Sequence, residues 1–141
     1  MKTILDAVRA LCAQCDFLSD FTNGENVDWS AGEAGSYGIF PTGESVVEGS
    51  ETMDGCVQWH YSFVLQALCF GVTDAERIEN SAFCERLANW IYAKNRTGIT
   101  LPQGCELVRI YAGGGQFVDW DDATQTGTYR IQCGIFYEKE Q

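Results

Sequence analysis

The stretch Val57-Gln58-Trp59-His60-Tyr61-Ser62-Phe63-Val64-Leu65-Gln66 decides the fold. Apolar side chains occupy its odd-numbered positions, and the even-numbered positions are polar except for Val64. Alternation with a period of two is typical of a strand that buries one face and presents a polar face on the other side. The sequence therefore predicts a sheet that is covered on one side.

A second alternating stretch, Tyr129 to Tyr137, predicts a long last strand. Helices are expected at residues 3–16, from an apolar stripe, and from a capping-box sequence at Thr73 to about Asn95. The pattern predicts an α+β fold, with two helices packed on one face of a mostly antiparallel sheet, in a single domain of residues 1–141. Six residues are expected to pack in its core: Leu11, Trp59, Tyr61, Phe63, Leu87 and Trp90.

The segments before the central strand are less well defined. Residues 17–36 are rich in Gly, Asn, Asp and Ser and are expected to form a long loop, pinned by Phe21 and Trp29. Pro41 is expected to end a short strand at residues 37–40, before a second short strand at residues 45–48.

Later in the chain, strands are expected at residues 107–112 and 116–120. The glycines at 113–115 predict a turn through which the second strand returns along the first. They do not form a phosphate-binding loop, because no Lys-Ser/Thr and no helix follow them. Asp119-Trp120-Asp121-Asp122 lacks the ligand order of an EF-hand, so a solvated hairpin turn is the preferred interpretation.

Charge is distributed unevenly along the 141 residues. The formal net charge is −11, and the stretch from Leu11 to Glu76 has eleven acidic residues and neither Lys nor Arg. This excess disfavours a protein that coats nucleic acid or binds anionic lipid. No apolar run approaches the roughly 20 residues of a membrane helix. We expect a cytoplasmic protein without a membrane partner.

The seven cysteines are odd in number and scattered, which favours buried thiols over disulfides. Cys12-Ala13-Gln14-Cys15 has the spacing of a redox or zinc motif, but it falls late in the first helix and no second pair accompanies it. We therefore expect neither metal nor cofactor. The seven are Cys12, Cys15, Cys56, Cys69, Cys84, Cys105 and Cys133.

His60 is the only histidine and the first candidate for a catalytic base. Its neighbours on the same strand face are Gln58 and Ser62, and neither is a carboxylate that could orient it. We interpret His60 as part of a polar sheet face, together with Arg130 and Gln132, that meets water or a neighbouring subunit. No catalytic, cofactor-binding or metal-binding residue is expected, and the chain is not expected to be an enzyme.

A further set of segments looks like core and turn positions of one fold, and none is a catalytic signature. They are Ser36–Pro41, Gln58–Phe63, Glu79–Glu85, Trp90-Ile91 and Thr128–Cys133. With these segments the chain resembles, over most of its length, a family of minor capsid proteins from phages and prophages of Gram-positive bacteria, which is similar in layout to phage tail terminators.

This resemblance implies a structural virion protein, made in the host cytoplasm, that joins head and tail. A tail terminator forms a ring, typically a hexamer, which caps the tail tube and docks to head-completion proteins. Its sheet lines the channel and its helices lie outside. DNA passes through the lumen without specific binding, and an acidic lumen would repel phosphate.

The sequence also suggests where and under which conditions such a ring would assemble. Strands between Tyr37 and Leu65 have no Lys or Arg to protect an exposed edge, so we expect identical subunits to associate there. Because the acidic stretch crowds like charges, we expect added salt to favour assembly.

Two alternative functions remain open. A small enzyme would show convergent titratable groups around His60 or Asp119. A small-molecule-binding α+β module would use Trp59 and Tyr61 to line a cavity instead of packing them on the helices.

Overall fold

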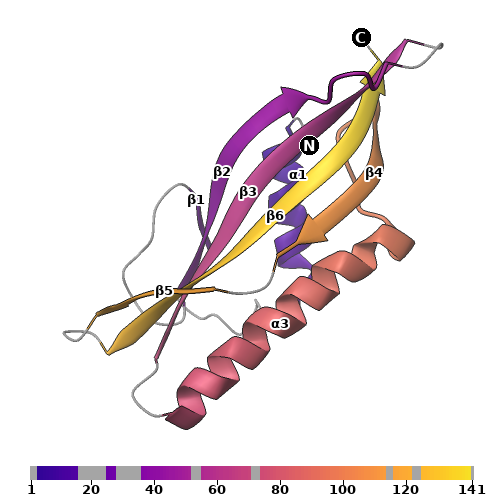
Figure 1. Ribbon diagram of the computed structural model, residues 1–141. Coiled ribbons are helices and arrows are strands. Elements are labelled where there is room, and N and C mark those ends of the chain that lie inside the picture. Colours follow the sequence, from indigo (N-terminus) through magenta and orange to yellow (C-terminus); the bar gives the residue numbers. More distant parts are fainter. Residues whose placement is uncertain are drawn as a thin grey trace.

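The computed structural model in Figure 1 shows a long, twisted sheet with two helices. The elements are α1 (Ile4–Ala13), β1 (Glu25–Val27), β2 (Ser36–Val46), β3 (Cys56–Phe70), α3 (Asp74–Thr97), β4 (Cys105–Ala112), β5 (Gln116–Asp121) and β6 (Thr126–Glu140). The structure describes residues 3–15, 25–27, 36–51, 55–70, 74–113, 116–121 and 125–140.

The strands follow the order β1-β2-β3-β6-β4, and β5 also pairs with β6. All pairs are antiparallel except β1 with β2. The two long strands β3 and β6 form the centre, paired from Cys56↔Glu140 to Phe70↔Thr126. The predicted α+β class and the mostly antiparallel sheet are confirmed.

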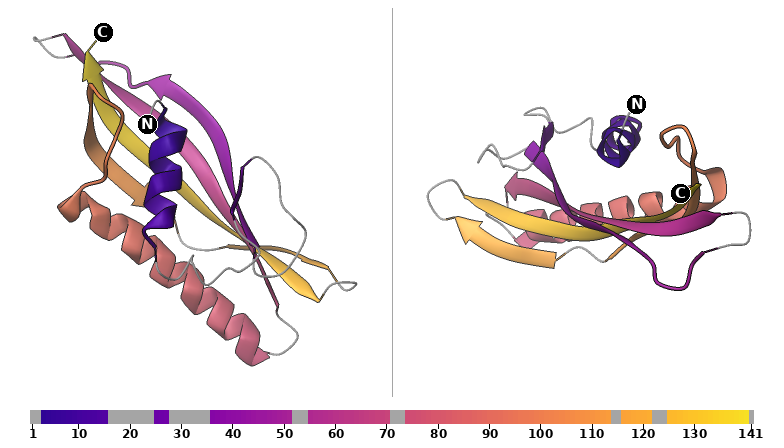
Figure 2. Two further views of the ribbon diagram at one scale, coloured as in Figure 1. Left: turned by 180° about the vertical axis from the view of Figure 1, so that it is seen from behind. Right: turned by 90° about the horizontal axis from the view of Figure 1, so that it is seen from above.

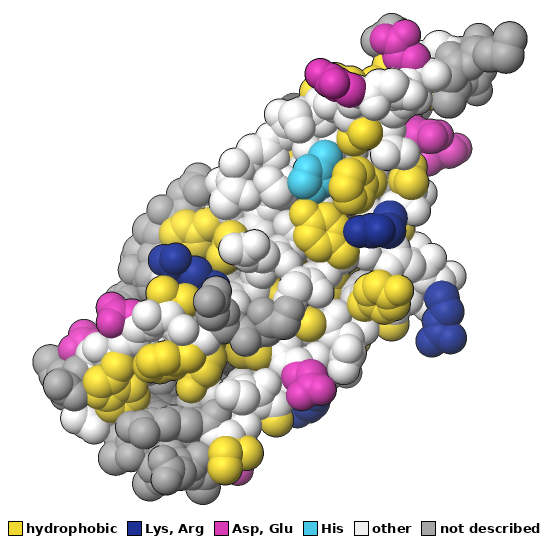
Figure 3. Space-filling view, viewed as in Figure 1, with side chains coloured by type: hydrophobic (Ala, Val, Ile, Leu, Met, Phe, Trp, Pro, Cys, Tyr) yellow, Lys and Arg dark blue, Asp and Glu magenta, His cyan; other side chains and the backbone are white. Residues whose placement is uncertain are grey.

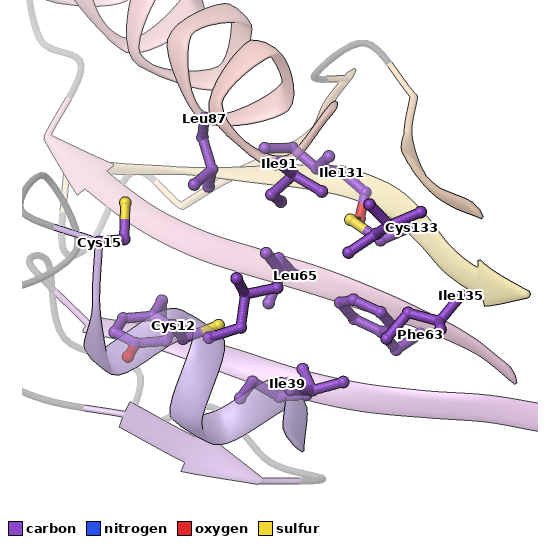
Figure 4. Packing of buried hydrophobic residues seen from close by; sticks show 14 of the residues in the cluster. Cys12, Cys15, Ile39, Phe63, Leu65, Leu87, Ile91, Ile131, Cys133 and Ile135 are labelled. Atoms are coloured by element: carbon purple, nitrogen blue, oxygen red, sulfur yellow. Dashed lines mark hydrogen bonds between the residues drawn. The ribbon is translucent and has the colours of Figure 1, made fainter. Parts of the chain in front are cut away.

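One hydrophobic cluster joins both helices to one face of the sheet, the core face. The odd-numbered residues of β3 and β6 point into it, and Phe63 pairs directly with Cys133. Figure 2 shows α1 on one side of the sheet, and Figure 4 shows Cys12 of α1 and Leu87 and Ile91 of α3 converging on these strands. Of the six expected core residues, Trp59 and Trp90 pack against the cluster but stay partly exposed, whereas the other four are buried.

Side chains fix both helices locally. The Thr3 hydroxyl accepts a hydrogen bond from the Asp6 amide, and the Asp6 carboxylate accepts one from the Thr3 amide, so α1 begins with a capping box. At the other helix, Asn95 donates to the Ile110 carbonyl at 2.8 Å and accepts from the Ile110 amide at 2.7 Å. Its side chain thereby occupies part of the outer edge of β4. The predicted cap at Thr73 lies outside the described residues.

Pro41 does not end a strand, which corrects the expectation of two short strands. Instead, β2 is continuous through residue 46, with a bulge at Thr42 between Pro41↔Phe63 and Gly43↔Ser62. β1 pairs with β2 only at residues 37–39. Proline is tolerated here because no described strand needs its missing N–H on the outer side.

The expected loop at residues 17–36 contains a short strand, β1, whose three residues show no readable period. Phe21 and Trp29, expected to pin this loop, lie outside the described residues. β1 is parallel to β2, and its pairing depends on tertiary contact more than on local sequence.

The chain does not reverse direction between β4 and β5, where the glycines at 113–115 predicted a turn. β4 pairs with the last part of β6, up to Ala112↔Cys133, and β5 pairs with the first part, from Gln116↔Arg130. Both strands are antiparallel to β6, so β5 continues in the direction of β4. The Gly113 amide still donates to the Gln132 carbonyl at 2.6 Å. The prediction of a hairpin at these glycines is therefore wrong, and the hairpin connects β5 to β6.

Neither helix within the described part of the chain is long and apolar enough to span a membrane.

Candidate functional site

The face of the sheet opposite the core is called the open face here. It carries the even-numbered residues of β3 and β6, because successive side chains of a strand point to opposite sides. Its exposure is intermediate to high at most positions, in contrast to the buried odd-numbered residues. As predicted, the structure brings five polar residues together on this face: Gln58, His60, Ser62, Arg130 and Gln132.

His60 lies in an aromatic cluster on the open face. Its ring stacks on Phe136, with centroids 4.4 Å apart, and its Nε2 is 2.8 Å from the Tyr111 hydroxyl. The Arg109 guanidinium lies 5.5 Å from the Phe136 ring and 5.6 Å from the Tyr111 ring. Of the described side chains, Tyr111 is the hydrogen-bond partner of His60. We call these four residues the aromatic cluster.

A bulge in β4 places two members of this cluster. Leu107 pairs with Tyr137 and Arg109 pairs with Phe136, so Val108 is the extra residue. An extra residue moves all following side chains to the other face. Arg109 and Tyr111 therefore point to the open face. Sequence reasoning missed both, because strict alternation from Leu107 would have placed them in the core.

Gly134 gives the Tyr111 ring its place. It pairs with Tyr111 across β4 and β6, and a Cβ atom at residue 134 would overlap the tyrosine ring. Burial raises the pKa of Tyr111; Cys133 also raises it, and Arg109 lowers it. Gly134 is itself buried, so the ring lies against the sheet surface.

A hollow of about 410 Å³ lies on the same face, on the β2 side. The Arg130 Nε donates a hydrogen bond to the Gln66 Oε1 at 2.8 Å, which leaves the terminal nitrogens of the guanidinium for another acceptor. The hollow is lined by Phe40, Thr42, Val64, Gln66, Arg130 and Gln132.

Two arginine side chains lie on the open face, although the chain as a whole is acidic. Arg109 and Arg130 are exposed, and neither forms an ion pair with a carboxylate of the described residues. Figure 3 shows His60, in cyan, beside hydrophobic and basic side chains. Pairing of the strands places the acids of this face toward its two ends: Glu106 and Glu138 at one, Asp119 and Asp121 at the other.

The cysteines lie mainly on the core side. Cys12, Cys15, Cys84 and Cys133 are buried, and all seven lie in the described ranges without forming a disulfide. Burial raises the pKa of Cys69 to about 12, with a further contribution from Cys84, and burial raises that of Cys84 to about 11. Burial likewise raises the pKa of Cys133, and Cys12 raises it further. These shifts disfavour the thiolate, which is the nucleophilic and metal-binding form.

Asp119, Trp120 and Asp121 belong to β5, not to a turn, which corrects the interpretation as a hairpin turn. Asp122 lies outside the described residues. The bulge between Phe117 and Asp119 determines to which face of the sheet the later side chains of this strand point, as the bulge in β4 does. No group of three His, Cys, Asp or Glu side chains that could hold a metal occurs among the residues that the structure describes.

Two further hollows lie outside the open face. One, of about 360 Å³, lies between α3 and β5 and is lined by Ser81, Phe117, Trp120 and Tyr129. The other, of about 350 Å³, contains Tyr137, whose hydroxyl donates to the Glu44 carboxylate. Burial, together with this hydrogen bond and the charge of Glu44, raises the pKa of Tyr137. Neither hollow includes His60.

Comparison with known families finds no family model that matches the chain, and comparison with curated proteins finds no match. Argument for a function therefore rests on the chain itself. The open face offers ring surfaces, two guanidinium groups and side-chain amides, which suit binding of carboxylates and flat or apolar groups.

Proposed function

We propose that this chain is a structural protein of a tailed phage or prophage, a tail terminator or head-tail joining protein that assembles into a ring on the tail tube. The sequence resemblance supplies the class. The fold supports it by leaving one side of the sheet without a described strand, since β1 covers β2 only as far as Ile39.

The outer edge of β2 from Phe40 to Val46 is the observation that carries the proposal. No described strand pairs with it, and it has no Lys or Arg. Exposed strand edges are normally blunted or covered. On the opposite side, Asn95 occupies part of the β4 edge. The β2 edge is thus the side of the sheet open to an identical subunit.

This location refines the expectation from the sequence. The stretch from Tyr37 to Leu65 was expected to supply unprotected edges, but residues 57–65 belong to β3, which is interior because β2 and β6 flank it. Only the part of that stretch in β2 forms an edge. A head-to-tail contact through it would leave each subunit with one donor and one acceptor surface, as a closed ring requires.

Sedimentation velocity across protein concentration and salt tests the assembly. We expect monomer at low salt and micromolar concentration, and a ring of about six copies of the 15.6 kDa chain at high concentration and salt, or on tail tubes. A chain that stays monomeric and does not bind tube ends contradicts the proposal and favours the small-molecule module.

A matched pair of variants locates the contact. Val46, 45% exposed, lies on β2, and Ile78, 69% exposed, lies on α3. Val46→Lys places a charge on the proposed contact edge and is expected to weaken assembly at least tenfold. Ile78→Lys adds the same charge on α3, away from the β2 edge, and is expected to assemble like the wild type. Equal behaviour of the two variants would exclude the β2 edge.

A further inference from the structure

The open face and the β2–β3 connection carry opposite charges that are not satisfied within one molecule. Arg109 and Arg130 have no carboxylate partner among the described residues. Glu48 and Glu51 are exposed in the β2–β3 connection, and no described cation pairs with them. Each surface therefore lacks a charge partner that the other could supply.

The described part of this connection, residues 47–51, is held by hydrogen bonds to β3. The Val47 amide donates to the Gln58 carbonyl at 2.9 Å, and the Gln58 amide donates to the Ser50 hydroxyl at 3.1 Å. Figure 1 shows it at the end of the sheet that also holds the C-terminus. We call residues 44–51 the acidic arm, since they include Glu44, Glu48 and Glu51 and no basic residue.

We propose that the acidic arm of a second copy of this chain docks on the open face, with the carboxylates of Glu48 and Glu51 at Arg109 and Arg130. This inference rests on the proposed self-assembly and names the surface that receives the β2 side of the neighbour. Guanidinium groups bind carboxylates through two parallel hydrogen bonds. Phe136 and Tyr111 lie beside Arg109 and offer apolar contact to Val46, which is 45% exposed on the arm.

A nucleic acid is the rival occupant, because exposed aromatic and arginine side chains on a sheet also bind single strands. The charge of the chain argues against it. The net charge is −11, and acids flank the arginines toward both ends of the face. Long-range repulsion therefore opposes a polyanion, whereas a short arm that offers the carboxylates of Glu48 and Glu51 fits between the acidic ends.

The contact also agrees with assembly at raised salt. Repulsion between the acidic regions of neighbouring subunits acts over long distances and is screened beyond about 8 Å at physiological salt. Arginine–carboxylate pairs in contact are screened less. Salt should therefore remove the barrier to association before it weakens the contact.

Charge-reversed variants test the proposal by mixing. The face variant is R109E/R130E and the arm variant is E48K/E51K. Each variant alone loses one of the two surfaces that a head-to-tail contact needs, so self-association should weaken about 100-fold. An equimolar mixture joins the intact arm of the first to the intact face of the second. The reversed arm, now basic, also matches the reversed face, now acidic, so both junctions regain opposite charges. We expect rings in which the two variants alternate, detected by sedimentation and native mass spectrometry.

Controls on α3 carry the same changes away from the open face. E79K/E85K alters charge as the arm variant does, and R86E/R96E alters it as the face variant does; all four positions are exposed. These variants should assemble like the wild type. Loss of assembly in the controls would assign the effect to net charge and overturn the proposal.

The remaining outcomes are also decisive. Ring formation by the face variant alone and by the arm variant alone, or a mixture of the two that does not associate, overturns the docking surface. If the face variant forms rings but no longer binds an oligo(dT) strand that the wild type binds, the occupant is nucleic acid. Rings that follow the expected mixing behaviour but do not bind tail tubes would support the docking contact and contradict the tail-terminator function. A wild type that never self-associates, with or without tubes, overturns both.

Discussion

The two faces of the sheet share one set of strand pairings but differ in what holds their side chains. On the core face, Phe63 and Ile135 are almost fully buried, and helices cover them. On the open face, His60 and Phe136 stack on each other while staying partly exposed. Burial of the core-face side chains stabilises the fold. The open-face side chains are held in place by their neighbours but remain accessible to solvent, so they are suited to binding.

The largest expected effect separates adjacent residues of β3. Phe63, 1% exposed, belongs to the core face, and Val64 lines the hollow on the open face. Phe63→Ala should lower the free energy of unfolding by about 3–5 kcal/mol through a core cavity. Val64→Ala should cost less than about 1 kcal/mol, since its side chain is only partly buried. Urea denaturation measures both, and equal losses would contradict the assignment of the faces.

A smaller effect is expected where α3 meets β4. Asn95→Ala removes both hydrogen bonds to the Ile110 backbone and leaves that amide and carbonyl without their described partner. We expect a loss of about 1–3 kcal/mol in unfolding free energy. Hydrogen exchange at the Ile110 amide should accelerate more than at core amides of β6. An unchanged exchange rate would show that Asn95 does not hold the edge.

Much of the core face could be predicted from the sequence, whereas the open-face cluster could not. Alternation places Phe63 and Tyr61 on the buried side because burial and strand period act on the same residues. The cluster depends on the extra residue Val108, and a single inserted position leaves no periodic signal. The direction of β5 depends on pairing with β6, which competes with the local turn preference of the glycines at 113–115.

Alkaline pH should destabilise the core face. The pKa of Cys84 is raised to about 11 and that of Cys69 to about 12, above the ordinary value near 8.5. Between these values the unfolded state loses protons that the folded state keeps, so stability falls as pH rises from about 8.5 toward 11. The slope is at most about 1.4 kcal/mol per pH unit for each group.

Urea denaturation under reducing conditions, from pH 7 to pH 10.5, measures this slope. Cys84→Ala removes one of the titrating groups, so the free energy of unfolding should fall less steeply with pH. The substitution also lowers that free energy by an amount that does not depend on pH. Tyr137, whose pKa is also raised, adds to the decline only above about pH 10, where an unfolded tyrosine ionises. A stability that does not change up to pH 10.5 would contradict burial of these thiols.

The smallest effect tests how the open-face cluster is built. Gly134→Ala forces the Tyr111 ring off the sheet and breaks its hydrogen bond to His60 at 2.8 Å. We expect a loss of about 1 kcal/mol, because the ring is at the surface and can move outward. In the background of Tyr111→Ala, the same glycine substitution has no ring to displace and should cost close to nothing. The difference between the two backgrounds is a coupling energy of about 1 kcal/mol, which a double-mutant cycle measures directly. If Gly134→Ala lowers stability equally in both backgrounds, the loss arises in the β6 backbone alone. Gly134 would then not position the Tyr111 ring.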